Sequence, residues 1–266
     1  MKTFFSNLLA IYRRELQSYF ISPFAYVIAV VFWLIGGLFL VTILLSPQGL
    51  IAQVGAADQL GASPQAIDVP YEFLKIYLNL LGSLSMFILP MLSMGLYAEE
   101  RKRGTLELLA TSPLANWVVA LGKLLGVVTF YSAMLLPLLI IQLVAFWSSE
   151  PTFPAAILLL GHFGLLLLAA SVLALGMFIS SLSDSTVLAA VMTFGVVLVL
   201  WVVDAIATAL PDPIGPALRH LSLLAHYTDF TLGVFDSSGL ILFLSYIVLG
   251  LFLTAQSVDT LRFQRS

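Results

Sequence analysis

Six long apolar runs limit what this sequence can fold into. About 20 mostly apolar residues are enough for a helix to cross the hydrocarbon core of a bilayer. Lipid cannot hydrogen-bond an exposed strand edge, and the sequence lacks the alternation of a membrane barrel, so we expect every run to be helical. The sequence therefore predicts an all-α membrane protein with six transmembrane helices. The runs are roughly Phe24 to Leu45, Leu74 to Tyr97, Val118 to Trp147, Ala155 to Ser180, Thr186 to Leu210 and Gly239 to Ala255.

Composition and charge agree with this class and suggest an orientation. Hydrophobic residues occupy 61 % of the 266 positions, against roughly 45 to 50 % in soluble domains. Cytoplasmic loops of membrane proteins are enriched in lysine and arginine. With both termini in the cytoplasm, nine of the 11 basic residues lie on that side, and only Lys75 and Arg219 lie outside. We therefore predict a multi-pass protein of the plasma membrane, the bacterial inner membrane, with both termini cytoplasmic.

The sequence gives no sign of a catalytic or metal site. There is no cysteine, and His162, His220 and His226 are too scattered for a metal cluster. The P-loop motif G-x-x-x-x-G-K-[ST] does not occur, and neither does H-E-x-x-H or G-x-S-x-G. We predict no catalytic residue, no metal, no cofactor bound by this chain and no nucleic-acid partner.

Residues 1–23 are predicted to form an amphipathic helix in the inner interface with membrane lipid, ahead of a single transmembrane domain over 24–266. Apolar residues recur at steps of three and four along this segment, and charged residues occupy the rest of its surface. Ser22 and Pro23 should end this helix and start the first span. A soluble tail is the alternative. The predicted interfacial residues are Tyr12, Arg13, Arg14 and Glu15.

The third run, Trp117 to Trp147, is longer than a span requires. Its 31 residues would measure about 46 Å as a helix, so part of it must protrude from the hydrocarbon core. Lys123 lies near the cytoplasmic end, where it is expected to snorkel to the headgroups; a buried gating cation is the alternative. Gly122 and Gly126 form a G-x-x-x-G spacing that allows close helix approach.

Two polar residues stand out within the later spans. Asp204 is the one acid inside an apolar run, and intramembrane acids are costly and often functional. It lies near the outer end of its run, so a solvated pathway residue and an outer-interface position are both consistent with the sequence. The same argument applies, less strongly, to His162.

The outer segments between spans differ in character. Residues 211–238 carry too much apolar surface for a solvated loop, but their charges and prolines forbid a full span. We predict an outer re-entrant hairpin of one or two short helices, covered by protein or an aqueous cavity. A plain surface loop is the alternative. The segment 46–73 is rich in glycine, proline and acids, and is expected to be a connector.

Charge is concentrated between the second and third spans. Five consecutive residues, Glu99 to Arg103, are charged in a chain with only 9 % charged residues. A role in fixing the membrane topology would explain Arg101 to Arg103, but it would not explain the residues that follow them. Gly104 and Thr105 indicate a turn and a helix cap, and a short half-apolar helix should follow. Such a helix could transmit force between the spans and a cytoplasmic partner. We therefore predict a coupling helix over about 99–113.

These stretches resemble a known family. "EERKRGTLELLATSPLANWVVALGKLLG" is similar to the first cytoplasmic loop of type 2 ATP-binding-cassette (ABC) exporter permeases, in which an acidic pair, a Gly-Thr, a Glu-Leu-Leu and a Ser-Pro precede the third span. "ELQSYFISPFAYV" resembles their interfacial helix running into span one. "GMFISSLSDSTVLAAVMTFGV" resembles the turn between spans four and five, and "LSLLAHYTDFTLGVFDSSGLILFLSYIVLGLFLT" the outer hairpin and last span. Gliding-motility and copper-maturation permeases are the most similar branch.

The resemblance implies a division of labour between chains. Two six-span permease subunits, identical or similar, would pair around a pathway and sit on two cytoplasmic P-loop ATPase subunits, which bind the ATP and Mg. The coupling helix would occupy a groove of the ATPase, and the interfacial helix would lie beside it. The implied coupling residues are Glu99, Glu100, Arg101, Gly104, Thr105, Glu107, Leu108 and Pro113.

Other functions are less consistent with the sequence. A proton-coupled secondary transporter or a channel without an ATPase partner is the main alternative. It would need ion-coupling residues in mid-membrane, pore-lining polar rings or internal repeats. Asp204 alone is weak support for a proton relay. An intramembrane enzyme or a structural scaffold is a further alternative. The substrate is not specified by the sequence.

Overall fold

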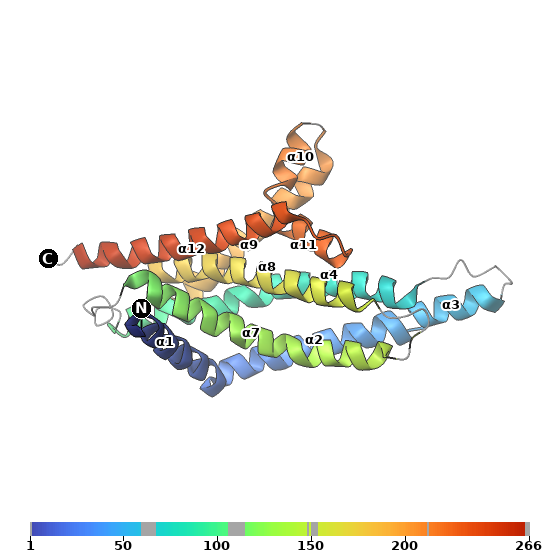
Figure 1. Cartoon of the computed structure of the whole chain (residues 1–266), viewed down its shortest axis with the longest axis horizontal. Coiled ribbons are helices and arrows are strands. Elements are labelled where there is room, and N and C mark those ends of the chain that lie inside the picture. Colours follow the sequence, from blue (N-terminus) through green and yellow to red (C-terminus); the bar gives the residue numbers. More distant parts are fainter. Residues whose placement is uncertain are drawn as a thin grey trace.

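The computed structural model describes residues 2–59, 68–105, 115–147, 149, 154–211 and 213–263. In these ranges the regular secondary structure is helical, and six helices are long and apolar enough to span a membrane. The predicted all-α membrane fold is confirmed. Most helices run along the long axis of the molecule, with α1 and the end of α12 at one end and α3 at the other (Figure 1).

Within the described ranges, seven helices supply the six spans, because a single residue, Met94, interrupts the second span. Five of the spans begin within two residues of the predicted positions. The spans are α2 (Pro23–Leu45), α4 with α5 (Val69–Ser93 and Gly95–Lys102), α7 (Asn116–Phe146), α8 (Ala155–Leu182), α9 (Thr186–Ala209) and α12 (Ser237–Phe263). The chain also forms α1 (Lys2–Ile21), α3 (Leu50–Gln59), α10 (Ile214–Arg219) and α11 (Leu223–Thr231).

Local capping explains where the first two spans begin. The Ser22 side chain accepts a hydrogen bond from the backbone of Ala25, and Pro23 occupies the first turn of α2, as predicted. Asp68 caps α4 in the same way by accepting from the backbone N–H of Tyr71. This cap starts the second span at Val69, ahead of the Leu74 expected from hydropathy alone.

Helix α8 is the centre of the bundle. It packs against α4, α7, α9, α11 and α12. In its most apolar stretch of 18 residues, 67 % of the residues are buried. Helix α9 is the least buried of the spans, because only 17 % of the residues in its most apolar 18-residue stretch are buried. A long apolar helix with so little cover inside its own chain must face lipid or another protein.

The segment predicted to be a connector contains a helix that the sequence did not suggest. Helix α3 lies within the segment 46–73, and it packs against α2 and α4 through its buried first residue, Leu50. Gly49 precedes it, and a Cβ there would lie 2.8 Å from the carbonyl oxygen of Leu44. The glycine therefore permits a tight approach to α2 and does not prevent the helix.

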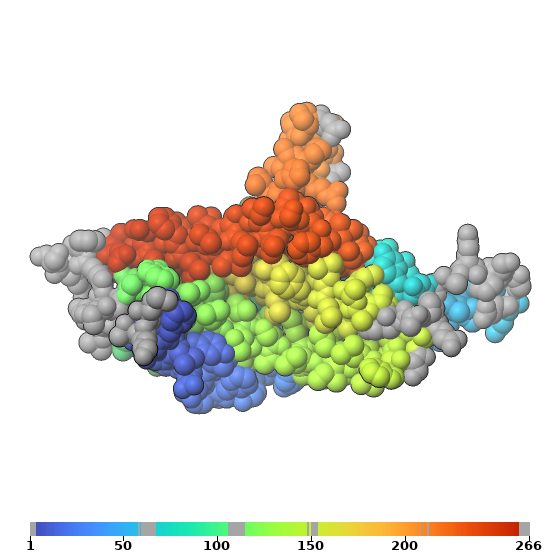
Figure 2. All heavy atoms as spheres, in the orientation of Figure 1, coloured from blue at the N-terminus to red at the C-terminus, as the bar shows by residue number. Residues whose placement is uncertain are grey.

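The segment 211–238 forms two short helices with different surroundings. Tyr227 and Phe230 on α11 are fully buried, and Phe230 packs against Gly164, well inside α8. Helix α11 therefore enters the bundle, and the surface-loop alternative is wrong for it. Helix α10 instead stands away from the bundle beside the end of α9 (Figures 1 and 2).

Candidate functional site

A buried lysine joins three helices at the end of the bundle where α1 lies. The Nζ atom of Lys123 on α7 lies 3.1 Å from a carboxylate oxygen of Glu15 on α1 and 3.2 Å from one of Glu100 on α5. It also donates to the carbonyl oxygen of Leu96 at 2.8 Å. The contacts with Glu15 and Leu96 are hydrogen bonds donated by the ammonium, and the contact with Glu100 is an ion pair. The Tyr97 ring adds a cation–π contact at 5.1 Å.

We call Lys123, Glu15, Glu100 and Arg14 the Lys123 cluster. Arg14 is the exposed member, and its guanidinium lies 3.6 Å from the same Glu100 oxygen that pairs with Lys123. The other three side chains are 5 to 14 % exposed. Removing one partner of such a buried pair costs about 3 to 5 kcal/mol, because an uncompensated charge remains. The cluster therefore fixes the relative positions of α1, α5 and α7.

The burial of Lys123 excludes one of the two interpretations of this residue, while a gating role stays a prediction. Snorkelling to the headgroups would leave the ammonium exposed, but the whole residue is only 4 % exposed. The snorkelling interpretation is therefore wrong, and the physical reason is the pair of carboxylates brought in by other helices. Hydropathy along α7 alone could not reveal partners that α1 and α5 supply.

Two glycines on α7 allow α1 to approach closely enough for this contact. A Cβ at Gly122 would lie 2.8 Å from Ile11, and a Cβ at Gly126 would lie 2.9 Å from the Cβ of Glu15. The G-x-x-x-G spacing is thus the surface on which α1 packs. Any larger residue at Gly126 would push Glu15 away from Lys123.

Tyr19 fastens the other end of α1 to the second span. Its hydroxyl donates to the carbonyl oxygen of Leu92 on α4 at 2.7 Å. Burial, assisted by the negative charge of Glu15, raises the pKa of Tyr19 well above its ordinary value, so the phenol stays a protonated donor at neutral pH.

The break between α4 and α5 is held by a serine from α8. Ser180 donates to the carbonyl oxygen of Met94 at 2.7 Å and accepts from the backbone N–H groups of Tyr97 and Ala98 at 3.1 and 3.0 Å. The first N–H groups of a helix have no partner within it, so this hydroxyl satisfies donors at the start of α5. Arg101 adds a second tie by donating to the carbonyl oxygen of Ser181 at 2.8 Å.

A defined turn ends α5. Gly104 has φ of +69°, its N–H bonds to the carbonyl of Arg101, and the N–H of Thr105 bonds to the carbonyl of Glu100. These two bonds are those of a Schellman motif, which requires the left-handed residue that glycine provides. The turn predicted at Gly104 and Thr105 is confirmed, and Thr105 closes α5 at its C-terminus.

The described residues account for part of the predicted coupling set. Glu100 pairs with Lys123, and Arg101 donates to Ser181, as described above. Glu99 instead forms an exposed ion pair with Arg103 at 3.3 Å. Lys102 is exposed at the end of α5. Glu107, Leu108 and Pro113 lie outside the described residues. Of the interfacial set, Tyr12 is half-buried, and Arg13 is exposed.

The polar residues of the other spans have partners in the fold. Asp204 accepts a hydrogen bond from Ser222 at 2.6 Å, and Ser222 also caps α11, so this acid ties α9 to the inserted helix. His162 is buried, and its Nδ1 atom lies 2.9 Å from the carbonyl oxygen of Leu158. A pathway role for Asp204 stays a prediction. Among the described residues, no group of three or more His, Cys, Asp or Glu is placed to hold a metal ion.

Sequence reasoning missed Ser180, Ser181 and Ser222, which hold the helices together at both ends of the bundle. Serine is common in membrane helices, so its presence alone carries no signal. The stretch "ISSLSDS" does cluster four serines where a span ends, and this clustering was the available hint.

The comparison with known proteins places the chain in a family. The family model described as ABC-2 type transporter matches residues 6–234 of the 266. This chain belongs to the ABC-2 type transporter family. The match includes most of α1, the Lys123 cluster, the turn after α5 and most of the segment 211–238. A search of curated proteins found no match.

Family membership gives the broad role of the molecule. It is a multi-pass membrane protein and the permease component of an ABC transporter, which is a transport component and not itself catalytic. ABC-2 permeases generally pair with a cytoplasmic ATPase subunit. The junction built by Lys123 joins α1 and α7 to α5, which ends in the turn at Gly104.

Proposed function

We propose that this ABC-2 permease exports its substrate across the bacterial inner membrane, driven by a separate cytoplasmic ATPase that docks at the end of α5. The single observation that carries this proposal is the Lys123 cluster. It connects the exposed end of α5 to two other helices through buried charge pairs. Both termini would be cytoplasmic, in keeping with the distribution of lysine and arginine.

The proposed complex contains two P-loop ATPase subunits, which bind ATP and Mg, and a second permease subunit. The low burial of α9 supports a second subunit, because a partner would cover apolar surface that this chain leaves open. The sequence motifs favour the branch that includes gliding-motility and copper-maturation permeases.

The contacts suggest how a movement of the docked ATPase would be transmitted to the transmembrane helices. ATP-driven closure of the ATPase would displace the turn at 103–105 and the end of α5. Arg101 and Ser180 would pass this displacement to α8, while Glu100 and Lys123 would pass it to α7 and α1. Buried charge pairs suit this role because breaking one of them leaves an uncompensated charge at high cost.

The structure also determines which charges to reverse in a test. Reversing Glu100 would place a second cation beside buried Lys123 and damage the fold, so it cannot report on docking alone. Lys102 is exposed on α5, and Glu107 is the acid that the family motif assigns to the coupling helix. A Lys102→Glu, Glu107→Lys variant therefore tests the docking surface.

The experiment is co-purification from the native membrane in mild detergent, with mass spectrometry of the proteins retained. We expect a P-loop ATPase in near-stoichiometric amount with the wild type and its loss with the Lys102→Glu, Glu107→Lys variant. The matched control is Glu72→Lys, Lys75→Glu, which reverses a half-buried ion pair on α4. Recovery of the wild type without an ATPase, from membranes in which other complexes survive, would contradict the proposal and favour a secondary transporter.

A further inference from the structure

Two adjoining cavities lie beside the Lys123 cluster, between α1, the start of α2, the end of α4, and α5. Their volumes are about 560 and 210 Å³. Both are lined by the same five residues at their junction, so they form one cleft, which we call the elbow cleft. The larger volume alone falls within the range of roughly 300 to 1,000 Å³ typical of small-molecule sites. The shared residues are Glu15, Ser18, Gly95, Glu99 and Arg103.

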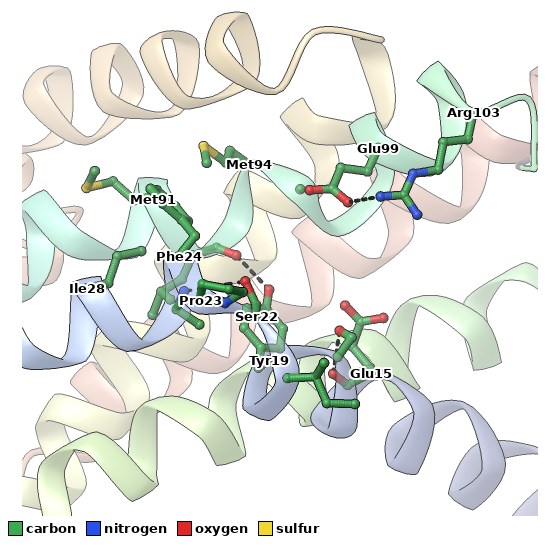
Figure 3. A pocket seen from close by; sticks show the side chains of 15 residues that line it. Glu15, Tyr19, Ser22, Pro23, Phe24, Ile28, Met91, Met94, Glu99 and Arg103 are labelled. Carbon is green, nitrogen blue, oxygen red and sulfur yellow. Dashed lines mark hydrogen bonds and ion pairs between the residues drawn. The ribbon is translucent and has the colours of Figure 1, made fainter.

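The elbow cleft is amphipathic along its length. In the larger cavity, apolar side chains gather at one end, and charged side chains gather at the other, where the smaller cavity adjoins it (Figure 3). A ligand that fills the cleft must therefore have an apolar part and a charged part. The labelled apolar residues are Phe24, Ile28, Met91 and Met94, and the charged ones are Glu15, Glu99 and Arg103.

The surroundings of α1 place this cleft at the level of lipid headgroups. Phe5, Leu9, Phe20 and Ile21 on α1 are 45 to 77 % exposed. An amphipathic helix with this much free apolar surface lies in the membrane interface, with that face in the acyl region. A lipid in the same leaflet can therefore present its headgroup to the cleft while its chains stay in the bilayer.

The charges at the junction of the two cavities match a zwitterion. Lys123 and Arg14 together balance the charges of Glu15 and Glu100. The remaining pair that faces the cleft is Glu99 and Arg103. These two side chains are 54 and 73 % exposed, and an exposed ion pair contributes little to stability. Each can therefore exchange its present partner for a ligand group of the same charge.

We propose that the elbow cleft binds the headgroup of a zwitterionic phospholipid with a primary ammonium, of the phosphatidylethanolamine type, from the leaflet on the α1 side. Arg103 offers paired donors to the phosphate. Glu99 accepts hydrogen bonds from the ammonium. A trimethylated choline headgroup has no N–H to donate, and a glycerol headgroup carries no cation, so this pair selects among bilayer lipids. The lipid would bridge α1 and α5, a role that goes beyond the proposed function and needs no ATPase.

The test uses the full-length protein, purified and delipidated in mild detergent without any partner. Phosphatidylethanolamine, phosphatidylcholine and phosphatidylglycerol with the same acyl chains are titrated, and bound lipid is measured by native mass spectrometry. We expect phosphatidylethanolamine to bind about ten- to a hundredfold more tightly than the other two lipids, because each of those leaves one charged hydrogen bond unmade. Equal binding of all three lipids would overturn the proposal.

Variants distinguish lipid binding in the elbow cleft from nonspecific lipid contact elsewhere on the protein. Glu99→Gln, Arg103→Gln should abolish the preference, whereas the control Glu72→Gln, Lys75→Gln should retain it. Met91→Trp should weaken binding of all three lipids by filling the apolar end. A preference unchanged in Glu99→Gln, Arg103→Gln would overturn the proposal. Because no ATPase is present, failure here leaves the co-purification result for the docking surface unaffected.

Discussion

The ammonium of Lys123 lies 3.1 Å from the carboxylate of Glu15, although 108 positions separate the two residues in the chain. The contact fastens α1 to α7, and Glu100 adds α5 to the same point. The interfacial helix, the end of the second span and the start of the third are thus held by one cation. Movement of any one of these helices must strain the other two or break a buried charge pair.

The Lys123 cluster should be a major source of stability. Lys123→Met nearly keeps the side-chain length but leaves two buried carboxylates with only the exposed Arg14 as a cation, beside Glu100. We expect a loss of about 3 to 5 kcal/mol, measured as a fall in the thermal midpoint of the purified protein. The variant Lys123→Met, Glu15→Gln, Glu100→Gln should recover most of the loss, because it removes the uncompensated charges. A triple variant as unstable as the single one would contradict this explanation.

Gly126 should be required for α1 to sit on α7. Gly126→Ala introduces a Cβ 2.9 Å from that of Glu15, whereas Gly195→Ala on α9 meets nothing within 4 Å. The chain has no native cysteine, so Phe4→Cys and Trp117→Cys, whose rings stack at 5.3 Å, can report the packing through a short cross-linker. We expect the yield to fall in Gly126→Ala and to stay unchanged in Gly195→Ala. Equal yields would show that the glycine does not control the approach.

Ser180 should stabilise the break in the second span. Ser180→Ala leaves the N–H groups of Tyr97 and Ala98 and the carbonyl of Met94 without this partner. An unsatisfied buried group costs about 1 to 3 kcal/mol, so the thermal midpoint should fall. Ser245→Ala is the control, because Ser245 is exposed and bonds only within its own helix. The prediction fails when the two variants unfold at the same temperature.

The orientation can be tested with single cysteines. Lys102→Cys at the end of α5 and Gln53→Cys on α3 are exposed positions at opposite ends of the bundle. A membrane-impermeant maleimide should label Gln53→Cys in intact cells and Lys102→Cys only in inverted vesicles. The reverse pattern would place the termini outside the cell.

The sequence predicted the spans well because lipid imposes a simple length and polarity rule. The bounds of α2, α8 and α9 follow directly from it. The burial of Lys123 could not be predicted in this way, since it depends on carboxylates supplied by α1 and α5. Helix α3 was missed for a related reason, because its stability comes from packing against neighbouring helices and not from its local composition.

The candidate site was predicted in outline but not in its internal contacts. The charged run and the Gly104 turn are local features, so the sequence alone located them. That Glu100 faces inward while Lys102 faces outward depends on how α5 is rotated against α8. That rotation is fixed by Ser180 and Arg101, and no periodicity within α5 indicates it.

Contact between the end of α5 and an ATPase is what the proposed function requires above all. The most direct measurement is to place a photoreactive residue at Lys102, irradiate native membranes, and identify the cross-linked protein by mass spectrometry. The control carries the same residue at Gln53. We predict a P-loop ATPase cross-linked from position 102 and absent from position 53. Cross-linking of other proteins without an ATPase at position 102, or the same ATPase at both positions, would contradict the proposed function.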